Sequence, residues 1–444
     1  MDFLQTYPQV AEYVEEFNYF GSLDVMGRLK FIHEHPLLEM ALLGFVGYVG
    51  WELYKALHQP PKNPYTFGKA RWGTMEDARK ANMLVKTPSG KRILVGKMGN
   101  EWMEAEIHAD VVGTNGGGKG VSIVYPNLLT WKGSLICNDL KGENFITTQR
   151  YRREVLGQEV YAIDPYGEVT DETAHFNPID YVIDGDPAGV KEANTVAEVL
   201  FPSKDGGNAF FDEGARGLIA TTIMYLVAAY PPEKRNLGTV REILTLTPEE
   251  KMTEFRKMQE CAQFSGAIRK GINQVLELAG EPTAPKKFDE NGNEIVVAQA
   301  KKSDGPNETV LDMYATVNIA MKFLDDERLV EVLKKSDMDL NLLKYTKQSI
   351  YLIVSASDLA VSSMLMRFIY SYALKKCVTS KRPLRAVELE LEPMKEPVLF
   401  LMDEFAQLKK FQIVRDMMPL ARGYNVRFLI MADSTCKCNT LKVE

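Results

Sequence analysis

The chain has 444 residues, of which 45% are hydrophobic and 25% are charged, a composition that is ordinary for a folded protein of two to three domains. The net charge of −7 argues against a protein that coats nucleic acid through a global basic field, although it leaves room for a local basic channel. Five scattered cysteines predict no disulfide framework and no metal site, which fits a reducing compartment.

The first 64 residues contain the candidate membrane segment. Residues 1–18 are polar and acidic, so we expect no cleavable signal peptide. Residues 37–54 carry a short apolar core whose length is typical of a buried or interfacial helix, whereas Trp51 and Tyr54 suit a membrane boundary. We therefore predict one membrane-anchoring helix here, followed by a stiff proline-rich linker at 59–64.

A glycine-rich loop lies between a strand-like segment, 106–112, and the start of a helix. Backbone N–H groups that turn inward around phosphate oxygens need glycine, and the helix N-terminus adds partial positive charge, so this layout predicts a phosphate-binding P-loop rather than an ordinary turn. Lys119 would reach the β- and γ-phosphates. Its residues are Gly113, Thr114, Asn115, Gly116, Gly117, Gly118, Lys119, Gly120 and Val121.

One position departs from the general P-loop pattern. The residue after the lysine, whose hydroxyl usually holds Mg²⁺, is Gly120, so this ligand is expected from Ser122, from water or from elsewhere.

Strand-like segments alternate with helical ones through most of the remaining chain, which predicts a parallel, doubly wound α/β sheet. Between residues 187 and 344 the pattern changes to helical periodicity, which predicts an all-α insertion. Inside it, residues 281–308 read as an exposed loop with a small hairpin around an Asn-Gly pair. The other strand-like segments are Arg92–Val95, Ser134–Asn138, Glu159–Ile163, Ser349–Val354, Val398–Met402 and Val426–Met431.

Carboxylates follow two of these strands. Asp403 would hold the Mg²⁺ hydration shell and Glu404 would polarise the attacking water, because in-line attack on a γ-phosphate needs a positioned water more than covalent chemistry. Asp139 and Glu143 follow a strand that we expect to neighbour the P-loop strand, so their carboxylates would face the nucleotide. A solvated turn is the alternative for this second pair.

Several ordered motifs resemble the type IV secretion coupling proteins, the TraG/TraD-like conjugative transfer ATPases. The resemblance covers residues 67–432, and the family shares the departure at Gly120. We expect the asparagine-proline turn among these motifs to fix backbone geometry rather than to perform chemistry. The motifs are FGKARWGT (67–74), GKGVS (118–122), PNLLTW (126–131), DLKGE (139–143), FNPID (176–180), FDEGAR (211–216) and MDEF (402–405).

The resemblance implies a RecA-like ATPase that uses ATP and Mg²⁺ and works as a homo-hexamer, with the nucleotide between subunits. It implies a bacterial inner-membrane location, single-pass or peripheral, with the ATPase domain in the cytoplasm. Its partners would be secretion-channel components and, through the all-α domain, relaxase–DNA complexes or effector proteins. The expected domains are an N-terminal segment, two parts of the nucleotide-binding domain and the insertion between these parts: 1–64, 65–186 with 345–444, and 187–344.

Two departures from the family affect these expectations. The chain offers one membrane candidate where relatives usually begin with two, and residues 433–444 lack both strand pattern and motif, so we expect the second part of the sheet to be incomplete. Such a truncated chain would bind nucleotide but be deficient as a motor. Two other functions stay open: a non-hydrolysing receptor or scaffold of the same machine, and an FtsK-like DNA translocase, which the insertion and the motif at 67–74 disfavour.

Overall fold

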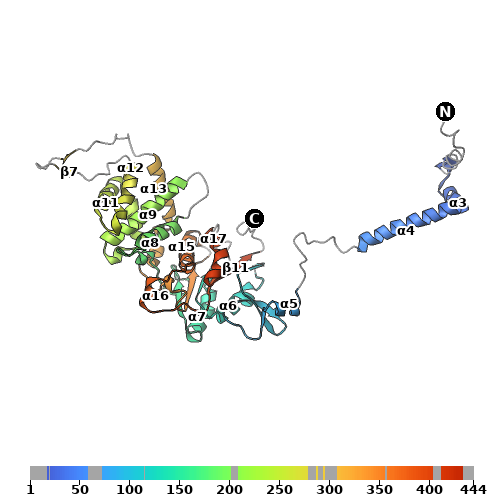
Figure 1. Cartoon of the computed structure of the whole chain (residues 1–444), viewed down its shortest axis with the longest axis horizontal. Coiled ribbons are helices and arrows are strands. Elements are labelled where there is room, and N and C mark those ends of the chain that lie inside the picture. The colour runs from blue at the N-terminus through green and yellow to red at the C-terminus, as the bar shows by residue number, and fades with distance from the viewer. Residues whose placement is uncertain are drawn as a thin grey trace, which may run out of the picture. The chain divides into compact units, whose positions relative to one another are not determined.

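The structure is a computed structural model, in which the chain divides into two compact units, Met1–Thr74 and Met75–Glu444 (Figure 1). Residues 67–72 of the first motif, Asn115, Glu404 and the stretch after residue 433 lie outside the described residues. The structure describes residues 18–19, 21–58, 73–114, 116–201, 209–278, 287–288, 294–295, 308–355, 358–403 and 412–433.

The described part of the N-terminal unit includes the consecutive helices α3 (Val25–Glu34) and α4 (Pro36–His58). The Asp24 side chain caps α3 by accepting a hydrogen bond of 2.8 Å from the backbone N–H of Gly27. Helix α4 covers the segment predicted at 37–54. Among the described residues it is the one helix that is long and apolar enough to cross a bilayer, by length and composition alone.

Within the described residues, six parallel strands form the main sheet of the second unit, in the order β4-β11-β10-β5-β9-β6. All residues of β5, β9 and β10 are buried, as expected for central strands covered on both faces. The predicted parallel sheet is therefore confirmed. Its strands are β4 (Ala109–Gly113), β5 (Leu135–Asp139), β6 (Glu159–Ile163), β9 (Gln348–Ile353), β10 (Val398–Met402) and β11 (Val426–Asp433).

The strand predicted at 92–95 belongs to another sheet. It forms β2 (Ile93–Met98), which pairs antiparallel with β3 (Glu101–Ala105), and β3 also pairs with β1 (Leu84–Val85). The reason is the connection: β2 and β3 are joined by two residues, of which Gly99 has a φ of 62°, and so short a turn permits only antiparallel pairing.

Side chains of the sheet alternate between two cores. Leu135 and Cys137 of β5 face the core that includes α6 and α7, whereas Ile136 between them faces the larger core that includes α15. The α-helices of this unit outside the stretch between β6 and β9 are α5 (Met75–Lys80), α6 (Tyr125–Thr130), α7 (Glu143–Glu154), α15 (Leu359–Cys377), α16 (Leu384–Glu388) and α17 (Gln412–Ala421).

A buried arginine connects α7 with its neighbours. Arg152 is fully buried and donates to the carbonyl oxygens of Leu128 and Trp131, to the Gln158 side chain, and to Ser349 Oγ of β9 at 2.8 Å. Its guanidinium thus ties the C-terminal end of α6 to the sheet.

The chain between β6 and β9 is mainly helical, and its helices pack together around α9, which is apolar around much of its circumference (Figure 1). The two short strands β7 and β8 pair antiparallel, as the predicted hairpin requires. The elements are α8 (Gly189–Leu200), α9 (Ala209–Ala229), α10 (Leu237–Thr245), α11 (Pro248–Glu260), α12 (Ala267–Leu278), β7 (Lys287–Phe288), β8 (Glu294–Ile295), α13 (Glu308–Ala320) and α14 (Glu327–Val332).

Helix α15 is bonded to this helical region. Lys376 pairs with Glu192 of α8, and Lys375 pairs with Glu198, about one and two-thirds turns further along α8. The Tyr372 hydroxyl also lies 3.5 Å from the Glu192 carboxylate. Ion pairs and packing thus join α15 to α8 over the C-terminal half of α15.

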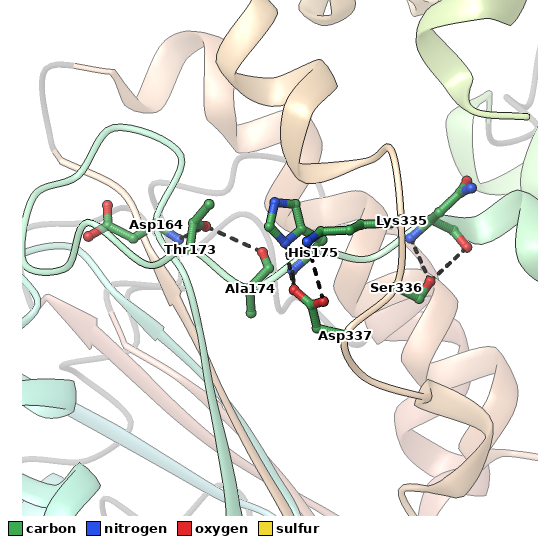
Figure 2. A network of polar contacts seen from close by, with 8 residues as sticks. Asp164, Thr173, Ala174, His175, Lys335, Ser336 and Asp337 are labelled. Carbon is green, nitrogen blue, oxygen red and sulfur yellow. Dashed lines mark hydrogen bonds and ion pairs between the residues drawn. The ribbon is translucent and has the colours of Figure 1, made fainter. Parts of the chain in front are cut away.

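The segments that lead into and out of the helical region are bonded to each other (Figure 2). The His175 ring lies 2.5 Å from the Asp337 carboxylate, which also accepts from the His175 backbone N–H at 3.0 Å. Asn177 is 1% exposed: its Oδ1 accepts from the Ile179 backbone N–H, and its amide donates to the carbonyl of Arg235 at 2.7 Å. These bonds give the asparagine-proline turn the structural role that was predicted for it.

Candidate nucleotide-binding site

The glycine-rich loop leaves the carboxyl end of β4 and runs into a π-helical turn, Gly120–Val124, which continues as α6. Gly116 and Gly118 have φ values of 72° and 76°, a left-handed conformation that favours glycine. A Cβ built on either residue would meet nothing within 4 Å, so backbone conformation rather than crowding requires glycine there. The described part of the loop therefore has the strand–loop–helix layout that the sequence predicts.

The Lys119 side chain lies against the start of its own loop. Its Nζ donates to the Gly113 carbonyl at 2.9 Å and lies 3.5 Å from the Thr114 carbonyl. An ammonium group has three N–H donors and no acceptor, so phosphate oxygens that enter the loop can take over these bonds. The geometry is compatible with the predicted role of Lys119.

Ser122 is close to the loop. Its hydroxyl donates to the Gly118 carbonyl at 2.7 Å, which leaves the lone pairs of Oγ available to a cation. Gly120 offers no side-chain ligand, and Val121 is 73% exposed beside it. Ser122 as a Mg²⁺ ligand stays a prediction.

Asp403 directly follows β10 and is held through its backbone. Its N–H donates to Asn138 Oδ1 at 2.8 Å, and its carbonyl oxygen accepts from Asn138 Nδ2. The Tyr370 hydroxyl of α15 lies 3.2 Å from the same Asn138 Oδ1 and donates to the Leu401 carbonyl at 2.9 Å. Asn138 was not among the predicted site residues. The signal for it was a polar side chain inside an apolar strand, immediately before Asp139.

Asp139 lies at the end of β5 and caps a helix. It is 2% exposed, and its Oδ2 accepts from the Phe145 backbone N–H at 2.8 Å at the start of α7. Burial and, to a smaller extent, the charge of Asp403 raise the pKa of Asp139, while the backbone N–H groups of Phe145, Asn144 and Lys141 lower it; together they leave this pKa at about 6. Glu143 is exposed in the first turn of α7. The roles of Asp139 and Glu143 toward a nucleotide stay predictions.

The expectation that the Asp139 strand neighbours the P-loop strand was wrong. Strand β11 pairs with β4 over five positions, and β10 lies between β11 and β5. The P-loop and Asp139 are therefore separated by two strands, whereas Asp139 ends β5 and Asp403 follows the adjacent strand β10. Strand order depends on where each crossover lands, which apolar patterning does not encode.

Replacing Asp139 with asparagine will change how stability depends on pH. A carboxyl whose pKa rises from 3.8 to about 6 on folding destabilises the fold by about 3 kcal/mol once it ionises. This loss develops as the pH rises from about 4 through 6, and asparagine can accept the same helix-capping bond without ionising. We expect the free energy of unfolding of Asp139→Asn, relative to the unchanged chain, to increase by up to about 3 kcal/mol between pH 4 and 7.

Chemical denaturation followed by circular dichroism across this pH range measures the difference. A difference that is independent of pH would show that Asp139 is not held in the buried cap.

A second feature with the dimensions of a binding site lies elsewhere. It is an open cavity of about 950 Å³, lined by residues of 319–328 and of α15 that include Lys322, Arg328 and Arg367. No predicted site residue lines it, so it is separate from the glycine-rich loop.

The residues at the loop and at Asp403 fit a nucleotide with Mg²⁺. The described residues contain no group of three or more His, Cys, Asp or Glu side chains that could hold a metal ion. Mg²⁺ does not require such a group, because it is usually held by one or two carboxylates together with water and substrate phosphates. Asp403 and Ser122 would supply the protein's part of such a site.

Comparison with known families gives one match over most of the chain. The model of the family described as "Type IV secretory system Conjugative DNA transfer" matches residues 65–439. Protein VirD4 of Rhizobium radiobacter is 27% identical over 384 residues, which cover 84% of this chain and 49% of VirD4. Conjugal transfer protein TraG of Escherichia coli is 22% identical over 425 residues, covering 89% of this chain and 62% of TraG. The chain thus spans about half the length of VirD4.

Solved structures of the bacterial conjugative coupling protein TrwB share the fold. Unbound TrwB has a TM-score of 0.52 at 12% identity, covering 83% of this chain and 72% of that one. TrwB in complex with ADP and Mg²⁺ has the same TM-score of 0.52 and 12% identity, covering 83% of this chain and 75% of that one. Together with the parallel sheet, this likeness shows an α/β, RecA-like fold.

Proposed function

Because this chain belongs to the type IV secretory system conjugative DNA transfer family, we propose that it is the coupling ATPase of a type IV secretion machine. It would recruit DNA–protein complexes or protein effectors to the secretion channel and use ATP binding and hydrolysis to do so. The observation that carries this proposal is the glycine-rich loop on β4, with Lys119, at the same carboxyl edge of the sheet as Asp403. Parallel sheets bind ligands at that edge.

The chemistry assigned to each residue follows from its place. Lys119 and the loop N–H groups would hold the phosphates, and Asp403 and Ser122 would hold Mg²⁺. Glu404, next to Asp403 in the chain, would orient the attacking water. Bound Mg²⁺ would neutralise charge on the phosphates during transfer to water.

The wider architecture is part of the same proposal. Residues 65–186 and 345–444 would form the nucleotide-binding domain, and 187–344 would form the all-α domain that receives cargo or its adaptor. Helix α4 would anchor residues 1–64 in the bacterial inner membrane, with the ATPase domain in the cytoplasm. The working form would be a homo-hexamer, because nucleotide sites of RecA-like rings lie between subunits.

The test is Mg²⁺-dependent ATP hydrolysis by the purified whole chain in detergent, with and without DNA, beside an Asp403→Asn variant. We expect the unchanged chain to hydrolyse ATP. The rate of hydrolysis by Asp403→Asn should be lower by at least about 100-fold, because this variant lacks the carboxylate that would hold the metal. In donor cells that lack the native gene, the unchanged chain should restore transfer and the variant should not.

Each alternative predicts a different result. Nucleotide binding without hydrolysis, together with transfer that Asp403→Asn leaves intact, would favour a docking receptor. Hydrolysis that only double-stranded DNA stimulates, without any requirement in secretion, would favour an FtsK-like translocase. A chain that binds no nucleotide would contradict the proposal.

A further inference from the structure

The buried side chain of Asn138 makes hydrogen bonds at the point where the strands β5 and β10 stop pairing. The register of β5 with β10 ends with Cys137 opposite Leu401. One position later, the Asn138 amide holds both backbone polar groups of Asp403, accepting from its N–H at 2.8 Å and donating to its carbonyl. Asn138 is 1% exposed, so water does not compete for these bonds.

Tyr370 of α15 adds further bonds to Asn138 and to the end of β10. Its hydroxyl lies 3.2 Å from Asn138 Oδ1 and donates to the carbonyl of Leu401, which precedes Asp403 by two residues. The orientation of the amide is determined by its partners, because a reversed Asn138 would place its NH₂ against the N–H of Asp403 and its oxygen against a carbonyl. Asn138 and Tyr370 therefore hold the backbone from which the Asp403 side chain projects.

We propose that Asn138 is a positioning residue for Mg²⁺: by fixing the Asp403 backbone it sets the direction of the carboxylate that holds the metal. The inference rests on the proposed function, in which Asp403 binds Mg²⁺ beside a nucleotide. Metal ligands need support from neighbouring groups, because displacement by about half an ångström or rotation by 10–20° weakens binding. A backbone held at both its N–H and its carbonyl supplies this support.

The Asn138→Asp variant tests the proposal with little change in volume. It keeps the oxygen that accepts from the Asp403 N–H but replaces the NH₂ donor with a second oxygen, which faces the Asp403 carbonyl and repels it. A fluorescent ATP analogue is titrated into the whole chain in detergent, first in EDTA and then at increasing Mg²⁺ or Mn²⁺. In EDTA, we expect the affinity of the variant for the analogue to stay within twofold of that of the unchanged chain. The metal concentration that gives half of the full change in this affinity should be at least about tenfold higher for the variant than for the unchanged chain.

Asn144→Asp is the matched control. Asn144 is also buried and lies near the same strand end, where its amide donates to Cys137 Sγ at 3.9 Å. Its metal dependence should equal that of the unchanged chain. A second variant, Tyr370→Phe, removes the hydroxyl and should raise the metal requirement about twofold to threefold; it carries the test if Asn138→Asp does not fold.

The outcomes separate the inference from the proposed function. If the unchanged chain responds to Mg²⁺ and both variants respond identically, the positioning role is overturned while the function stands. If Asn138→Asp loses affinity equally in EDTA and in Mg²⁺, its role is structural and the inference is again overturned. If the unchanged chain binds nucleotide without any response to Mg²⁺, the proposed function is itself contradicted.

Discussion

Replacing Lys119 with alanine is expected to lower ATP hydrolysis by at least about 100-fold, the size of effect seen when one preorganised donor to developing charge is removed. The lysine is the cation of the glycine-rich loop, and its Nζ lies at the carbonyls of Gly113 and Thr114, where the loop begins. Nucleotide affinity should fall as well, because the same ammonium would contact the β- and γ-phosphates in the ground state. The measurements are phosphate release under saturating ATP and binding of a fluorescent ATP analogue.

Lys132→Ala is the control for this experiment. Lys132 follows the C-terminal end of α6, its side chain is exposed, and it belongs to the same strand–loop–helix unit as Lys119. The Lys132→Ala variant should hydrolyse ATP at the rate of the unchanged chain. In cells, Lys119→Ala should abolish transfer while the protein still binds its cargo. Transfer at the normal level with Lys119→Ala would show that the chain acts by docking rather than as a motor.

Replacing Arg152 with alanine is expected to destabilise the fold by about 4 kcal/mol or more. The guanidinium is fully buried, and its removal leaves a cavity together with acceptors that have lost their donors, including the carbonyls of Leu128 and Trp131. Burial lowers the pKa of Arg152 to about 10, which still leaves it charged at neutral pH. The fold therefore already carries the cost of burying this cation, and its hydrogen bonds offset that cost.

The neighbouring residue provides the comparison. Arg153 is exposed on the same helix, and its guanidinium donates to the Gln149 side chain and to the Val160 carbonyl at 3.2 Å. Arg153→Ala should cost no more than about 1 kcal/mol. Denaturant unfolding of the two variants measures both effects. Equal losses for Arg152→Ala and Arg153→Ala would contradict the role assigned to the buried network.

The predicted main-sheet strands were found. The strands β5, β9 and β10 are buried over their whole length, as strands covered on both faces are, and their mainly apolar sequences indicated this, whereas β4 at the edge contains Asp110 and has no fully buried residue. The pattern could not show that Arg92–Val95 belongs to a hairpin, since this depends on the two-residue turn at Gly99. Nor could it show that β11 enters the sheet between β4 and β10, because strand order is decided by three-dimensional packing.

The candidate site could likewise be predicted only in part from the sequence. The glycine-rich loop and Asp403 follow from local chemistry, and both lie at the ends of the predicted strands. A carboxylate at the end of a strand, such as Asp139, is typical of a catalytic site. The environment of Asp139 is nevertheless determined by the start of α7, where its side chain accepts a hydrogen bond from a backbone N–H six residues further along the chain. Asn138 was missed because its partner, Asp403, is 265 residues distant along the chain. Contacts between distant segments are what single-sequence reasoning lacks.

Helix α15 is bonded to two separate parts of the molecule. Its 19 residues correspond to a rod about 28 Å long. Midway along this rod, Tyr370 is bonded to the strand end that carries Asp403, and near its C-terminal end Lys375 and Lys376 are bonded to α8. One helix therefore contacts both the helical region and the strand end where the proposed function places Mg²⁺.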